Sequence, residues 1–375
     1  MLVTSSQIPF AAALLMIAGM SPTATAADQS LQAACFAPDT LRALDDEKLI
    51  ARGDRRFDKP PKADAALAPS AAIDIARRGA IRRVDLPKGE KLVALTFDLC
   101  EQRGEIAGYD GALFDTLRRE NVKATLFAGG KWMRSHEART EQLMTDPLFE
   151  IANHGENHRN LRLFDLPTIQ SEIAGPQLAY ERARRRLVTT QCAARVPGGV
   201  DALPPRMNLF RFPFGACNEA SLAAVNDAGL LAIQWDVASG DPDPRQSPQA
   251  IANAIVRGVK PGSIVVLHGN GRGWNTAAAM PLVIPKLKAL GYAFVTVSEL
   301  LARGTPVIET SCYSTKPGDT DRYDFLAGAK LNPTPATPSS AGAVARESGP
   351  GTRSKPQVAP RDTADHTGPA LNRPF

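Results

Sequence analysis

Between residues 91 and 303, short apolar runs alternate with longer segments in which hydrophobic residues recur at helical spacing. The run Val93-Ala94-Leu95-Thr96-Phe97 is short, apolar and rich in β-favouring residues, which is typical of a buried strand. The predicted strands cover residues 93–97, 124–127, 149–152, 209–212, 231–237, 263–267 and 292–297. The predicted helices cover residues 112–120, 141–146, 168–187, 221–228, 248–256 and 280–290, and a last one opens at Ser298. Strands separated by helices indicate parallel βαβ units, arranged as an open doubly wound sheet or as a barrel.

The segments on either side of this region lack the alternation. Residues 27–90 form a mixed leader rich in Ala, Asp and Arg, for which we expect a helix and an extended arm. Residues 304–375 form a tail that is largely rich in Pro, Ser and Thr. From residue 331 onward the tail has almost no large apolar residue and cannot bury a core, so we expect it to be largely disordered.

The first 26 residues have the pattern of a secretory signal peptide. An apolar run over residues 8–20 precedes the small-residue sequence Ala24-Thr25-Ala26, and the run is too short to span a bilayer comfortably. Residues 1–7 contain no Lys or Arg, which departs from the usual signal pattern. No later segment of the sequence is long and apolar enough to span a membrane. We therefore expect an exported protein of the cell envelope, periplasmic or secreted.

Composition and charge say little about the number of domains or the kind of partner. The length of 375 residues suits one large domain with extensions or two ordinary domains. A formal charge of +5 suits acidic wall polymers and nucleic acid equally well and selects neither. The five cysteines include no C-x-x-C pair, so a zinc knuckle is not expected, and in an oxidising compartment some of them should pair.

Side chains that could act in catalysis or bind a metal stand at the ends of five predicted strands. They are Asp98, the pair His154 and His158, Arg211, the two aspartates Asp236 and Asp241, and His268. Each alone has an ordinary explanation, such as a turn-opening aspartate, a pair of surface histidines or a histidine capping backbone. In a parallel αβ barrel, however, all these strand ends surround one mouth.

The combination at that mouth indicates a hydrolytic site. Because His154 and His158 are four residues apart, they would share one face of a helical turn and could bind one cation. Two imidazoles and a carboxylate suit Zn²⁺ or a similar divalent ion. A free carboxylate beside the ion can take a proton from water, and a histidine opposite can protonate a leaving amine.

These residues resemble the motifs of the polysaccharide deacetylase family, the NodB-homology domain of carbohydrate esterase family 4. The resemblance extends over residues 91–303, and the motifs occur in the family's order. They are Thr96-Phe97-Asp98, His154-Gly155-Glu156-Asn157-His158, Arg211-Phe212-Pro213-Phe214-Gly215, Ser239-Gly240-Asp241 and Leu267-His268. The resemblance implies an α/β fold, a distorted (β/α) barrel, and removal of N-acetyl groups from a GlcNAc-containing polysaccharide such as peptidoglycan or a chitin-like polymer.

It also implies a role for each matched residue. Asp98 would be the catalytic base, Arg211 would orient it, and His268 would be the general acid. Asp241 would fix the tautomer of His268 and support its charged form. The metal ligands would be His154 and His158.

One position departs from the family pattern. The family's first motif usually has two successive aspartates, of which the second is a metal ligand, and here Leu99 stands in the second place. The third ligand could be Cys100, Glu101 or Asp110, or water could fill the place. Cys100 could instead form a disulfide with Cys217, since both lie just beyond motif-bearing strands. We expect metal binding that is weaker than usual in the family or is completed by another residue.

Two aromatic residues near the motifs could contact the substrate. Trp274, just after His268, and Phe214 are the candidates for stacking on a sugar ring. The expected partner is a polysaccharide rather than nucleic acid. Two alternatives stay open: a non-catalytic glycan-binding or scaffold relative with a decayed site, and an O-acetyl esterase on the same fold. Retention of the whole acid–base set favours an enzyme.

Overall fold

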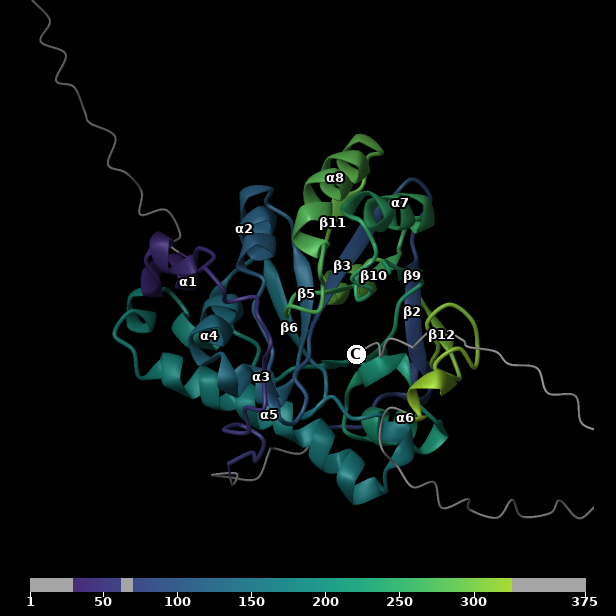
Figure 1. Cartoon of the computed structure of the whole chain (residues 1–375), viewed down its shortest axis with the longest axis horizontal. Coiled ribbons are helices and arrows are strands. Elements are labelled where there is room, and N and C mark those ends of the chain that lie inside the picture. The colour runs from purple at the N-terminus through teal and green to yellow at the C-terminus, as the bar shows by residue number, and fades with distance from the viewer. Residues whose placement is uncertain (1–29, 62–69, 326–375) are drawn as a thin grey trace, which may run out of the picture.

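The computed structural model describes residues 30–61 and 70–325 (Figure 1). The expected signal peptide and the part of the tail beyond residue 325 lie outside these ranges. Within them, no helix combines the length and the apolar character needed to cross a membrane.

A curled, mostly parallel sheet forms the centre of the described structure (Figure 1). In spatial order its strands are β12 (Thr305–Glu309), β2 (Ala80–Asp85), β8 (Leu231–Ile233), β7 (Leu209–Phe210), β6 (Phe149–Asn153), β5 (Ala124–Ala128), β3 (Leu92–Leu99), β10 (Ile264–His268) and β9 (Val237–Ala238), with β11 (Ala293–Phe294) also paired to β3. Only β12 in this sheet is antiparallel to its neighbour. The sheet curls back on itself, so that β2 comes close to the chain just before β10. There the Val84 N–H of β2 donates to the Gly262 carbonyl at 2.9 Å. The predicted distorted (β/α) barrel is therefore confirmed.

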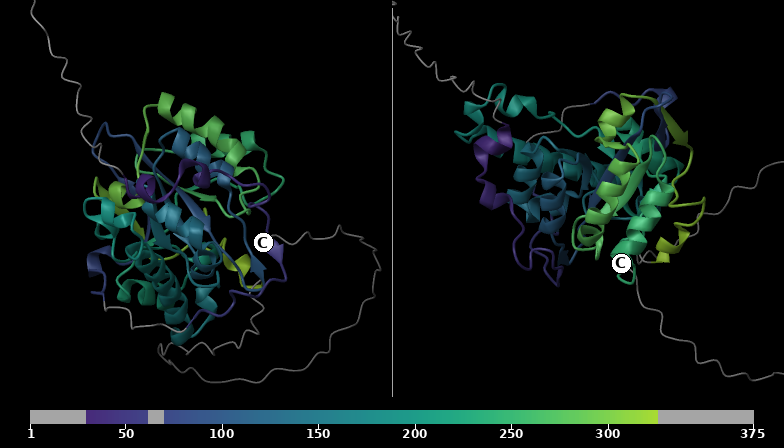
Figure 2. Two further views of the ribbon diagram at one scale, coloured as in Figure 1. Left: turned by 90° about the vertical axis from the view of Figure 1, so that its left-hand side faces the viewer. Right: turned by 90° about the horizontal axis from the view of Figure 1, so that it is seen from above.

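Helices cover the outside of the curled sheet (Figure 2). They are α2 (Gly111–Arg119), α3 (Gly130–Ser135), α4 (Glu137–Thr145), α5 (Leu166–Val188), α6 (Glu219–Asp227), α7 (Pro248–Gly258), α8 (Thr276–Ala289) and α9 (Val297–Leu301). The leader helix α1 (Leu31–Cys35) packs beside α4 instead. Several begin at a side chain that caps the first turn. Asp165 accepts the Thr168 N–H before α5, and Ser247 accepts the Ala250 N–H before α7, each followed by a proline in the first turn.

Shorter elements complete the described chain. Strand β1 (Ala51–Arg52) of the leader pairs with β4 (Glu105–Ile106) in a separate two-stranded sheet. The 3₁₀ turns are η1 (Pro38–Leu41), η2 (Ile75–Arg77), η3 (Leu161–Leu163), η4 (Ala193–Arg195), η5 (Gly199–Ala202), η6 (Pro213–Gly215) and η7 (Asp321–Tyr323).

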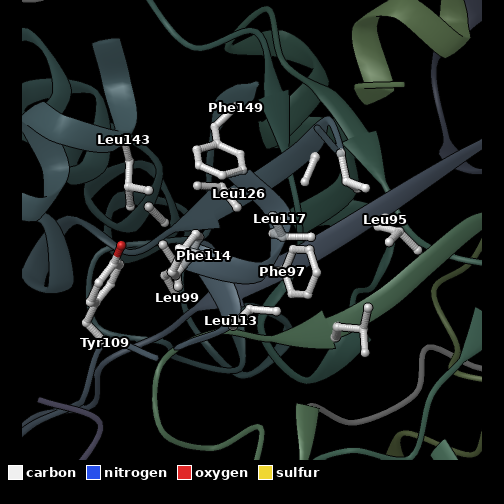
Figure 3. Packing of buried hydrophobic residues seen from close by; sticks show 14 of the residues in the cluster. Leu95, Phe97, Leu99, Tyr109, Leu113, Phe114, Leu117, Leu126, Leu143 and Phe149 are labelled. Atoms are coloured by element: carbon white, nitrogen blue, oxygen red, sulfur yellow. The ribbon is translucent and has the colours of Figure 1, made fainter. Parts of the chain in front are cut away.

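The largest hydrophobic cluster lies between β3, β5 and the helices that cover them (Figure 3). Leu99 belongs to this cluster and is fully buried, with Leu95, Phe97 and Phe114 as fellow members. Tyr109 stacks on Phe114 with ring centroids 4.7 Å apart. Leu99 therefore packs as a core residue.

Most predicted elements are confirmed, but two strands of the central sheet were not predicted. Strand β2 was overlooked inside the leader because its sequence, AIRRVD, contains two arginines. Strand β12 was not predicted inside the tail; it lies at the edge of the sheet, where a strand tolerates a proline such as Pro306. The predicted strand over 231–237 is in fact two strands, β8 and β9, and the strand over 292–297 shrinks to β11.

The cysteines pair differently from the expectation. Disulfides join Cys35 to Cys192 and Cys217 to Cys312, and Cys100 is free and buried. The predicted Cys100–Cys217 bond is therefore wrong. Cys217 is linked instead to the segment that follows β12, which the sequence analysis had assigned to the tail.

Candidate active site

Three parallel strands bring the candidate catalytic and metal-binding residues to one mouth of the barrel. Asp98 lies near the end of β3 and His268 at the end of β10, and the two are direct register partners. His154 comes directly after Asn153, the last residue of β6. A cavity of about 250 Å³ opens there, and Asp98, Cys100, His158, Asp241 and His268 are among its lining residues.

Asp98 is held by a buried arginine. Arg211 is fully buried, and its Nη1 donates to Asp98 Oδ1 at 2.8 Å and to Thr96 Oγ1 at 2.7 Å. The Phe127 ring lies 3.9 Å from the guanidinium carbon and covers one face of the group. Burial opposes ionisation of Asp98, but the charge of Arg211, the charge of His268 and the Arg211 hydrogen bond outweigh it and lower the pKa of Asp98. Asp98 is therefore an ionised carboxylate in a fixed orientation.

The predicted helical turn between the two histidines of the H-x-x-x-H motif is wrong. The two residues are joined by a loop. Gly155 and His158 have positive φ values of 75° and 51°, and this backbone brings the rings to 5.1 Å between centroids. His154 Nδ1 lies 2.9 Å from the Arg211 carbonyl, which fixes this nitrogen as the N–H donor. Burial lowers the pKa of both histidines, which favours their neutral forms.

The neutral rings present unused lone pairs. His154 Nε2 and His158 Nδ1 are buried and have no hydrogen-bond partner. Orphaned buried nitrogens of this kind are costly unless a ligand satisfies them. The imidazole arrangement thus fits a metal site, with the backbone carbonyl of Arg211 orienting one ligand.

Among the three candidates for a third ligand, Cys100 is the one that the structure places beside the histidines. A ligand atom from each of Cys100, His154 and His158 lies within 4.8 Å of the others. Burial raises the pKa of the Cys100 thiol to about 12, whereas the nearby Arg272 charge and an Asn270 Nδ2 hydrogen bond to Sγ at 3.0 Å favour the thiolate. Two imidazoles and a sulfur are a donor set that fits Zn²⁺.

Glu101 and Asp110 are engaged elsewhere. Glu101 Oε2 accepts the Ala107 N–H at 3.0 Å and the Ser135 hydroxyl at 2.8 Å. Asp110 forms an ion pair with Lys48 at 2.8 Å and precedes α2. Neither joins the cluster of Cys100 and the two histidines.

His268, on the strand next to that of Asp98, is supported by Asp241. Asp241 Oδ1 lies 3.0 Å from His268 Nδ1, and Oδ2 accepts the His268 backbone N–H at 2.7 Å. The hydroxyls of Ser239 and Thr276 donate to the same carboxylate at 3.0 and 2.7 Å. Burial disfavours the imidazolium, but the charge and hydrogen bond of Asp241 overcome this and raise the pKa of His268. The Nε2 of His268 is thus left free to carry a proton at the cavity.

The two aromatic candidates differ in position. Phe214 lines the cavity with a φ of 61°, and its ring lies 4.5 Å from that of His158 and 5.3 Å from that of Tyr323. A non-glycine residue in this backbone region is strained, and such strain is found at functional sites. Trp274 is 50% exposed and is not among the residues that line the cavity.

Sequence reasoning missed several residues of the cavity wall. Ser314, Arg322 and Tyr323 line it from the segment after β12, which carried no motif. Asn270, which holds Cys100, stands in the glycine-rich loop after His268, and that loop was the one available signal.

Comparison with known proteins gives consistent matches. The family model described as polysaccharide deacetylase matches residues 85–233. A peptidoglycan-N-acetylglucosamine deacetylase of Bacillus cereus is 30% identical over 223 residues, which is 58% of this chain and 91% of the relative. A Listeria monocytogenes enzyme of the same description is 27% identical over 59% of this chain, but the chain spans only 41% of its length.

A solved structure has the same fold. The crystal structure of a peptidoglycan N-acetylglucosamine deacetylase in complex with an N-hydroxybenzamide superposes with a TM-score of 0.50 at 21% identity. The match covers 60% of this chain and 94% of the other.

Proposed function

The chain belongs to the polysaccharide deacetylase family, and we propose that it hydrolyses N-acetyl groups of a GlcNAc-containing polysaccharide, such as peptidoglycan or a chitin-like polymer, with the help of a divalent metal. The observation that carries the proposal is the placing of a candidate base and a candidate acid on neighbouring strands of one cavity. Asp98 is oriented by Arg211, and His268 is supported by Asp241. A binding protein or scaffold needs neither pair.

Asp98 would take the proton of the attacking water. Its carboxylate is ionised, and Arg211 holds one oxygen, so the other oxygen remains available to water in the cavity. Because Arg211 is fully buried and also bonded to Thr96, the carboxylate cannot rotate away without losing these contacts.

His268 would give a proton to the departing amine. The pKa of this imidazole is raised by Asp241, so that it holds a proton at neutral pH better than a free histidine does. Asp241 in turn accepts bonds from two hydroxyls and a backbone N–H, which keep it in place as the imidazole gains and loses charge.

His154, His158 and Cys100 would hold the metal, which we infer to be Zn²⁺ because of the sulfur donor. A divalent cation there would supply Lewis acidity toward the acetamide carbonyl and toward water. The Leu99 position contributes no ligand, since its side chain is buried in the core.

Two disulfides in the described structure support a location outside the cytoplasm, where such bonds persist. This agrees with the signal-peptide pattern of the sequence. The proposed partner is accordingly an envelope or extracellular polysaccharide.

The test is acetate release from peptidoglycan and from chitooligosaccharides by the wild-type chain and by Asp98→Asn. We expect release by the wild type, and a kcat about 10²- to 10⁴-fold lower in the variant, because the general base is lost. Asp39→Asn serves as the matched control, since Asp39 is a highly exposed aspartate of the leader. Undiminished release by Asp98→Asn would remove Asp98 from the mechanism, and no release from any N-acetylated glycan by the wild type would contradict the function.

A further inference from the structure

The segment Cys312–Asp324, here called the C-terminal wall, is fastened to the barrel beside the cavity. The disulfide Cys217–Cys312 anchors its start. Arg82 of β2 donates to the carbonyls of Tyr313 and Ser314 at 2.6 and 2.8 Å, and its guanidinium carbon lies 3.8 Å from the centre of the Tyr313 ring. In Figure 1 this last described part of the chain lies beside β12.

The far end of the wall is fastened as well. Arg162 forms ion pairs with Asp321 at 3.0 Å and with Asp324 at 2.6 Å, and Asn160 donates to Asp324 at 2.9 Å. In between, Asp319 accepts the backbone N–H groups of residues 314–316. The wall is therefore a preorganised surface, and Arg322 and Tyr323 reach the cavity from it.

The charges around the cavity are balanced with one exception. Among the lining residues, Asp98 is paired with Arg211, Asp241 with His268, Asp243 with Arg245, and Arg272 with Glu105. Arg322 has no carboxylate partner among the residues that the structure describes. Arg322 contacts its neighbour Tyr323: its Nη2 donates to the hydroxyl at 2.9 Å, and its guanidinium carbon lies 4.8 Å from the ring centroid. An unpaired, exposed guanidinium at the edge of a substrate cavity is a ready partner for a carboxylate.

We propose that Arg322 of the C-terminal wall binds a carboxylate of the polysaccharide, so that the preferred substrate is an acidic GlcNAc polymer and not a neutral one. The inference rests on the proposed function. Tyr323 and Phe214, with ring centroids 5.3 Å apart, form an aromatic surface next to Arg322 on which the sugar carrying or adjoining the carboxylate can pack. Arg322 is thus a specificity-determining residue of this chain.

The test measures binding rather than turnover. In an Asp98→Asn background, Kd is measured by calorimetry for three tetrasaccharides that all carry N-acetyl groups. They are neutral chitotetraose, a peptide-free GlcNAc–N-acetylmuramic acid tetrasaccharide with free lactyl carboxylates, and the same glycan with stem peptides, whose carboxylates are peptide carboxylates only. Tighter binding of the second or of the third probe identifies which carboxylate is recognised.

The decisive variant is Arg322→Gln. We expect it to weaken binding of the preferred acidic probe about three- to tenfold, to the level of chitotetraose, and to leave chitotetraose unchanged. The wild-type preference should also shrink as salt is raised. Arg119→Gln removes an exposed arginine of α2 and should change none of the three constants.

The outcomes separate this inference from the proposed function. Equal losses for neutral and acidic probes, no loss for either, or no binding of any probe would overturn the role of Arg322. If binding follows the expected pattern but the wild-type chain releases no acetate, the role of Arg322 is supported and only the proposed deacetylase function is contradicted.

Discussion

Residue by residue, the site depends on the alternation of side chains along β3. Asp98 and Cys100 are two positions apart and both line the cavity, whereas Leu99 between them packs in the core. A thiol two residues after the base can therefore reach the histidines, while the intervening side chain cannot. This is the physical reason why the proposed metal site does not need an aspartate at the Leu99 position.

The Asp241–His268 pair predicts the alkaline limit of activity. His268 must be protonated to act as the acid, so its raised pKa keeps the enzyme active to higher pH, and activity falls as pH rises through that pKa. Asp241→Asn removes the charge that raises the pKa of His268. The descending limb of the kcat profile should then move to lower pH, with kcat about 10- to 100-fold lower. A limb that stays in place would show that another group sets it.

At the level of elements, the ends of the central strands could be predicted from sequence, because each motif follows a short apolar run. Asp98, His154, Arg211 and His268 were placed at one mouth for this reason. The third metal ligand could not be chosen, since a strand's exact end decides which side chain faces the cavity. The loop that joins His154 to His158 depends on a positive φ at His158 itself, for which the residue type gives no signal.

The C-terminal wall could not be predicted at all. Strand β12, which precedes it, is short, half-buried and starts with Thr-Pro, and the wall itself is held by a disulfide and by ion pairs between residues distant in sequence. Long-range contacts of this kind leave no periodic pattern in the sequence. Strand β2 was likewise not predicted, because it contains two arginines and its neighbours β8 and β12 are distant from it in sequence.

The disulfide Cys217–Cys312 predicts a coupling between this wall and substrate binding. Replacing both cysteines with serine should cost about 2–4 kcal/mol of unfolding free energy and should raise KM, because the wall is released from the barrel. The double variant of Cys35 and Cys192 removes a bond between α1 and the chain after α5. It should lower Tm without raising KM, and an equal rise of KM in both variants would contradict the coupling.

At the scale of the whole molecule, the leader is built into the domain. Asp58 forms an ion pair with the fully buried Lys131 at 2.6 Å, and Glu47 pairs with Arg139 at 2.6 Å. Lys48 donates to the Trp274 carbonyl at 3.1 Å, which fastens the leader to the loop after His268. The leader and the C-terminal wall thus both pack around a barrel whose mouth carries the Asp98–Arg211 and Asp241–His268 pairs and the cluster of Cys100 with two histidines.

The most direct test of this account is a Zn²⁺ titration of the metal-free chain, with acetate release from an N-acetylated glycan as the readout, for the wild type and for Cys100→Ala. We predict that chelation abolishes release, that Zn²⁺ restores it in the wild type, and that Cys100→Ala needs a Zn²⁺ concentration about 10- to 100-fold higher. Release that persists after all metal has been removed would contradict a metal-dependent deacetylase. An identical Zn²⁺ requirement in the two proteins would exclude Cys100 as a ligand.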